Sequence, residues 1–138
     1  MNVYLQLKIT GTLLIALGLA HSFFGRYFKW KKELAQLSLL TRQIFLVHSF
    51  FIALSVILIG ACTLFYTEAL LRSGTLSRVV LTGLVAFWLV RLGFQIFVYD
   101  PAIWRGHRFY TFMHVVFSLF WAYVVITYGA ALRLAWGE

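Results

Sequence analysis

The stretch Trp88-Leu89-Val90-Arg91-Leu92-Gly93-Phe94-Gln95-Ile96-Phe97-Val98-Tyr99-Asp100-Pro101 is apolar and of helix length, yet it carries an arginine and a glutamine inside it. Arg91, Gln95 and Tyr99 follow one another at four-residue steps, so a helix places them on one face. Trp88 comes three residues earlier on the same stripe. An arginine inside a membrane span costs about 2.5–3.5 kcal/mol on insertion scales. We therefore predict that a ligand or another part of the protein offsets this cost.

The composition indicates an integral membrane protein in a lipid bilayer. Of its 138 residues, 62% are hydrophobic and 12% are charged, with a mean hydropathy of +0.89, whereas soluble domains carry about 25% charged residues. The formal net charge of +8 comes mostly from basic residues that flank apolar segments. Membrane topology and anionic lipid headgroups explain such charges, so we expect no nucleic-acid partner. The single Cys62 excludes an internal disulfide and a cysteine-based zinc site.

Four apolar segments have the length of membrane spans, at approximately residues 3–24, 44–66, 76–99 and 109–131. Basic and aromatic residues mix after the first segment, and leucines recur at helical spacing up to Arg42. The predicted fold is an all-α membrane protein, a single domain over residues 1–138. Its four transmembrane helices form a bundle, with a short interfacial helix between helices 1 and 2. Gly11, Gly18 and Gly25 fall seven residues apart, a spacing that lets a neighbouring helix approach closely.

Basic residues are distributed unequally between the two predicted membrane sides. The connections over residues 25–43 and 100–108 hold seven, namely Arg26, Lys29, Lys31, Lys32, Arg42, Arg105 and Arg108. The side with the termini holds four, namely Lys8, Arg72, Arg78 and Arg133. The positive-inside rule then predicts that both termini are non-cytoplasmic, and we expect a bacterial inner (plasma) membrane.

Four polar positions from four different spans are predicted to lie in one layer. His21 lies near the end of span one, His48 near the start of span two, Gln95 near the end of span three and His114 near the start of span four. At 1.5 Å per residue, each lies about 5–8 Å inside the same membrane surface, and Arg91 lies about one turn deeper. Polar residues in spans tend to face the bundle interior and to mark sites.

This layer predicts a polar intramembrane pocket. His21, His48 and His114 are candidate ligands of a transition-metal ion or of haem iron. Arg91, Gln95, Tyr99 and Trp88 are the candidate ligand-binding residues. Because no Asp or Glu lies deep in a span, Arg91 would pair with a haem propionate, a quinone oxygen, a lipid phosphate or a substrate carboxylate.

Simpler structural roles compete with each of these assignments. A membrane histidine commonly bonds across helices or sits among headgroups. Arg91 would then reach backbone carbonyls or extend toward the surface. For Trp88 and Tyr99 the alternatives are core packing and the aromatic belt at the membrane interface.

The leading functional hypothesis is an accessory or anchor subunit whose pocket binds haem, a metal ion or a quinone-like ligand. In architecture alone, the expected bundle resembles the small haem- and quinone-binding membrane anchors of respiratory dehydrogenases. One alternative is a membrane enzyme acting on a lipid or isoprenoid, with a histidine base such as His48 and with Arg91 on an anionic group. The other is a purely structural or assembly protein. We expect other membrane subunits or a homo-oligomer as partners. The lack of deep carboxylates disfavours di-iron and proton-pump chemistry.

Overall fold

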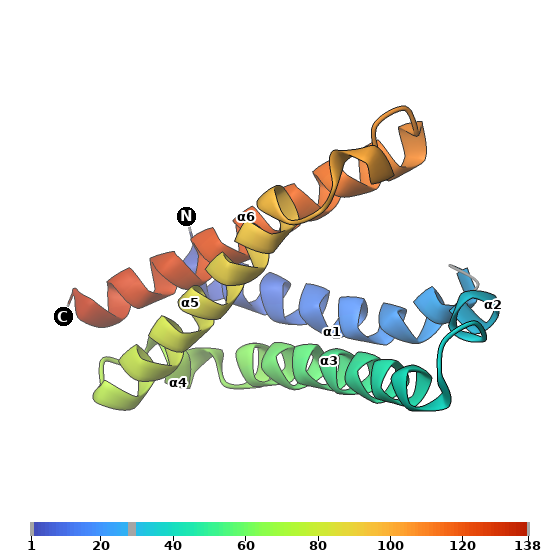
Figure 1. Ribbon diagram of the computed structural model, residues 1–138. Coiled ribbons are helices and arrows are strands. Elements are labelled where there is room, and N and C mark those ends of the chain that lie inside the picture. Colours follow the sequence, from blue (N-terminus) through green and yellow to red (C-terminus); the bar gives the residue numbers. More distant parts are fainter. Residues whose placement is uncertain (1, 28–29, 138) are drawn as a thin grey trace. The chain divides into compact units, whose positions relative to one another are not determined.

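The computed structural model describes residues 2–27 and 30–137, and this part is helical without strands (Figure 1). Four helices are long and apolar enough to cross a membrane: α1 (Val3–Tyr27), α3 (Leu39–Phe65), α5 (Thr75–Phe97) and α6 (Arg108–Trp136). Three short elements join them: α2 (Trp30–Leu34), α4 (Thr67–Leu71) and the 3₁₀ helix η1 (Pro101–Ile103). The predicted all-α fold with four spanning helices is confirmed, and the chain is a small integral membrane protein.

The start of α3 differs from the prediction. The expected interfacial helix reached Arg42, whereas α2 ends at Leu34 and α3 begins at Leu39. The reason is an N-cap: the Ser38 hydroxyl oxygen accepts a hydrogen bond from the Thr41 backbone N–H at 3.2 Å. At 1.5 Å per residue α3 is about 40 Å long, so it extends beyond a hydrocarbon core of about 30 Å.

Two compact units make up the chain and are described separately. The first, called the α1–α3 unit, is Leu7–Thr67, and the second, called the α5–α6 unit, is Met1–Gln6 with Glu68–Glu138. That the whole chain forms a single domain stays a prediction. The predicted interfacial stretch includes basic side chains that lie outside the described part, namely Arg26, Lys29 and Lys31.

Within the α1–α3 unit, two antiparallel helices meet at glycines. A Cβ on Gly11 would lie 2.8 Å from the carbonyl oxygen of Gly60, and a Cβ on Gly60 would lie 2.8 Å from that of Gly11. A Cβ on Gly18 would collide with the Ile57 side chain. The predicted close approach at Gly11 and Gly18 is therefore confirmed, and Gly25 lies outside the described side chains.

Lys8 links α1 to the end of α3 in the same unit. Its ammonium donates a hydrogen bond to the carbonyl oxygen of Leu64 at 2.6 Å. Leu64 lies in the last turn of α3, where carbonyls have no partner inside the helix and carry the negative end of the helix dipole. The contact therefore places a cation from α1 on the C-terminal end of α3.

The α5–α6 unit is built as a second antiparallel pair, with an analogous contact at its end. The Arg78 Nε donates to the carbonyl oxygen of Ala135 at 2.8 Å, close to the end of α6. Its guanidinium also lies 4.9 Å from the centre of the Trp136 ring. In the same unit, the Tyr123 hydroxyl donates to the Gln6 side-chain oxygen at 2.7 Å. The Arg78 contacts join α5 to α6 at the end opposite the polar stripe of α5, and the Tyr123 contact joins α6 to the start of α1.

Candidate functional site

Residues at seven-residue spacing on α5 and α6 face each other across the antiparallel pair. Gln95 meets His114, and one heptad along the helices Trp88 stacks on Trp121. Trp88 is 1% exposed, Gln95 5% and Trp121 4%. Two of the four positions predicted to share a layer, Gln95 and His114, are thus brought into direct contact.

The Gln95–His114 hydrogen bond orients the imidazole. The Gln95 amide nitrogen lies 3.1 Å from Nδ1 of His114. In this arrangement the amide donates to Nδ1, and a neutral ring carries its proton on Nε2. In the other tautomer, with the amide turned, Nδ1–H donates to Gln95 Oε1 and Nε2 presents a lone pair, as a metal ligand would.

Trp104 joins the site from the loop between α5 and α6. Its ring stacks on His114 with centroids 4.6 Å apart and planes 10° apart. The loop is held by the Thr111 hydroxyl, which donates to the Trp104 carbonyl at 2.6 Å, and it turns at Gly106, whose φ of 85° favours glycine. In the sequence, Trp104 falls in the connection over residues 100–108, and no spacing signal connects it to His114.

Arg91 lies one turn before Gln95 on α5. Its guanidinium carbon lies 4.8 Å from the centre of the Trp121 ring, which stacks on Trp88 with centroids 5.0 Å and planes 15° apart. This cation–π contact is the interaction that the described residues give the Arg91 side chain, which makes no hydrogen bond or ion pair with them. We call Trp88, Arg91, Gln95, Trp104, His114 and Trp121 the polar–aromatic cluster.

Three indole N–H groups of the cluster are buried without a hydrogen-bond partner among the described residues. They are Nε1 of Trp88, of Trp104 and of Trp121. Leaving a buried donor unsatisfied costs about 1–3 kcal/mol. The cluster thus combines a guanidinium that forms no hydrogen bond or ion pair with the described residues and three unpaired indole donors.

Three predicted site residues, Tyr99, His21 and His48, are not part of the polar–aromatic cluster. Tyr99 follows the end of α5 at Phe97 and is 47% exposed, so it is not part of the helix that carries Arg91 and Gln95. In the α1–α3 unit, Nδ1 of His21 bonds the carbonyl oxygen of Leu17 at 2.9 Å and Nδ1 of His48 bonds that of Ile44 at 2.8 Å. Both histidines therefore bond their own helix.

Because His21 and His48 belong to one unit and His114 to the other, the predicted three-histidine metal site stays a prediction. Over residues 2–27 and 30–137, no group of three or more His, Cys, Asp or Glu side chains is placed to hold a metal ion. No protein-family model, curated protein or solved structure matches the chain.

The Gln95–His114 pair gives a first testable prediction. Gln95→Leu leaves Nδ1 without its donor, and His114→Phe leaves the amide without its acceptor while keeping a ring beside Trp104. Each single change should lower the free energy of unfolding in detergent by about 1–3 kcal/mol, and the double change by less than their sum. Strictly additive effects would show that the two side chains do not interact.

Proposed function

We propose that this membrane protein is an accessory or anchor subunit that binds an amphiphilic ligand at the polar–aromatic cluster of the α5–α6 unit. The observation that carries the proposal is Arg91, a cation inside an apolar helix with no acceptor among the described residues. Short connections between the helices leave no soluble domain in the described part, which supports an accessory role.

Magnitudes support a missing partner for Arg91. An arginine at the centre of a span costs about 2.5–3.5 kcal/mol, and Arg91, about 9 Å from the end of α5, bears part of that cost. A cation–π contact with Trp121 returns about 0.5–2 kcal/mol. A ligand with acceptor oxygens would add stabilisation through the guanidinium N–H groups, which make no hydrogen bond with the described residues.

Among the expected ligands, the arrangement favours one with acceptor oxygens, such as a quinone-like molecule or a lipid headgroup. In the arrangement with the Gln95 amide nitrogen on Nδ1, a neutral His114 ring carries its proton on Nε2. Haem or metal ligation through Nε2 would need the other tautomer, in which Nδ1–H donates to Gln95 Oε1. An absorption spectrum with a Soret band, or metal found by elemental analysis, would support haem or metal instead.

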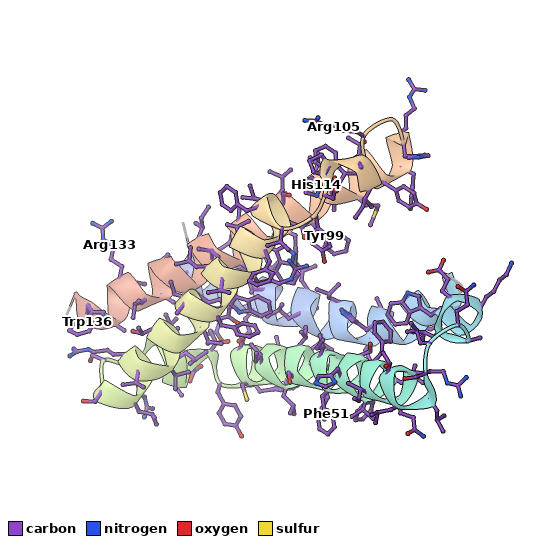
Figure 2. The ribbon with its side chains drawn as sticks, viewed as in Figure 1. Phe51, Tyr99, Arg105, His114, Arg133 and Trp136 are labelled. Carbon is purple, nitrogen blue, oxygen red and sulfur yellow. The ribbon has the colours of Figure 1, made fainter. Side chains whose placement is uncertain are left out.

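Retention of a bound molecule during purification tests the proposal. Native mass spectra of protein extracted in mild detergent should show a bound small molecule with the wild type. Arg91→Leu should lose it, because its acceptor atoms no longer find charged donors. Arg133→Leu is the matched control, since Arg133 is exposed and projects away from α6 (Figure 2). Equal retention by both variants would contradict the proposal, and the same spectra report partner subunits or extra copies of the chain.

We also propose that both termini are non-cytoplasmic in a bacterial inner (plasma) membrane. The proposal rests on the seven basic residues of the two connections against four on the opposite side. A phosphatase that is active only outside the cytoplasm should therefore be active when fused after residue 138. A fluorescent protein that folds only in the cytoplasm should stay dark there, and the reverse pattern would show the opposite orientation.

A further inference from the structure

We infer that the ligand of the polar–aromatic cluster carries an anionic oxygen group, a phosphate or a carboxylate, held by Arg91 beside Trp121. This inference rests on the proposed function and names the chemistry of its ligand. It comes from the balance of donors and acceptors in the cluster, from the absence of acidic residues in the spans, and from the apolar surroundings of Arg91.

Nearly every polar side-chain atom of the cluster that lacks a partner is a donor. Arg91 offers five N–H groups, and His114 in the tautomer described above offers its Nε2–H. The indole N–H groups of Trp88, Trp104 and Trp121 are also donors, but they are buried and out of a ligand's reach. Gln95 Oε1 is the one side-chain acceptor left over in the cluster. A group that brings several acceptor oxygens complements this inventory, whereas a cation would be repelled by it.

The positive charge of Arg91 favours an anionic ligand over a neutral ligand with acceptor oxygens. A guanidinium stays protonated in proteins, so Arg91 keeps its positive charge inside the apolar helix. The four acidic residues of the chain, Glu33, Glu68, Asp100 and Glu138, all fall outside the four apolar helices. One oxygen of the Asp100 carboxylate accepts a hydrogen bond from the Ala102 N–H at 2.8 Å, in the cap of η1 after the end of α5. A neutral quinone would supply acceptors but would leave the charge unbalanced.

The position of Arg91 fits an amphiphile whose charged group lies below the membrane surface. Arg91 comes six residues before the end of α5 at Phe97, which is about 9 Å along the helix. It is half-buried, while Phe87 and Phe94, its neighbours four residues before and three after, are 52% and 54% exposed. The buried indole N–H groups are not open to a ligand, so the anion meets the guanidinium first.

The experiment is a titration of the purified full chain in neutral detergent, followed by native mass spectrometry. The probes are short-chain phosphatidylglycerol for phosphate, a medium-chain fatty acid for carboxylate, short-chain phosphatidylcholine as the zwitterionic control, and a short-chain benzoquinone as the neutral acceptor. The variants are Arg91→Gln, which keeps N–H donors without charge, Arg91→Lys, which keeps the charge, and Arg133→Gln as control. Circular dichroism confirms that each variant is helical.

We expect at least one anionic probe to bind the wild type and Arg133→Gln equally. Arg91→Gln should weaken that binding about tenfold or more, and added salt should weaken it in the wild type. Arg91→Lys should recover part of the affinity. Preference for phosphatidylglycerol would identify a lipid phosphate as the source, and preference for the fatty acid a carboxylate.

Other outcomes would overturn the inference in distinguishable ways. Binding of benzoquinone alone among the four probes would reject the anion and keep the proposed function. Equal binding of phosphatidylcholine and phosphatidylglycerol would reject the need for negative charge. If no probe binds and nothing co-purifies with the wild type, the inference and the proposed function both fail.

Discussion

Gly60→Val should destabilise the α1–α3 unit by about 3 kcal/mol or more, at or above the upper end of the usual cost of overpacking. A Cβ at this position would lie 2.8 Å from the carbonyl oxygen of Gly11 and 2.9 Å from the backbone nitrogen of Ile15. Both atoms belong to the backbone, so no side-chain rotation relieves the clash. The two helices must separate, and dispersion contacts along their interface are lost together.

The control for this change is Gly83→Val on α5, where a Cβ would meet no atom within 4 Å. The two variants introduce the same residue into a helix, so they share its intrinsic cost in helix propensity. Unfolding in mixtures of mild and denaturing detergent, followed by circular dichroism, measures the difference. Equal stability of the two variants would show that α1 and α3 do not approach closely at Gly60.

Trp121→Ala should have the second large effect, because it removes the ring on which both Trp88 and Arg91 lie. Replacing a buried aromatic residue by alanine costs about 3–5 kcal/mol in soluble proteins. In soluble proteins part of that cost is the free energy of moving the side chain out of water. Lipid tails are as apolar as the protein core, so this part is reduced, and we expect about 3 kcal/mol, the lower end of the range.

The same unfolding measurement tests Trp121→Ala, with Phe112→Ala as control, since Phe112 is on the same helix and 63% exposed. Trp121→Phe should recover most of the stability, because it restores a ring between Trp88 and Arg91. A change of less than about 1 kcal/mol for Trp121→Ala, the scale of an ordinary substitution, would contradict the stacked arrangement.

Hydropathy and composition were sufficient to predict the four spanning helices. A long apolar segment in lipid must satisfy its backbone hydrogen bonds internally, and a helix does so. The bounds were harder to predict. The N-cap at Ser38 starts α3 at Leu39, earlier than predicted. Because α5 ends at Phe97, Tyr99 is not on the helical stripe predicted for it.

The site could be predicted in part. Four-residue steps indicated the face of α5 that carries Arg91 and Gln95, and depth along the spans placed Gln95 and His114 in one layer. Periodicity within one helix does not fix its register against another. The stacking of Trp104 on His114 depends on the path of a loop. Likewise, the bonds of His21 and His48 to their own helices depend on side-chain rotamers, which composition does not reveal.

The contacts of Lys8 and Arg78 affect how the folded protein meets charged lipids. Both cations donate to carbonyl groups at helix C-termini, where the partial negative charge of the dipole offsets part of theirs. Of the four cations predicted on the side of the termini, Arg72 and Arg133 therefore carry most of the attraction for that leaflet. With the proposed topology, the charge available to lipids would be more unequal between the two sides than the residue count suggests. Anionic lipids should then gather preferentially in the leaflet next to the two more basic connections.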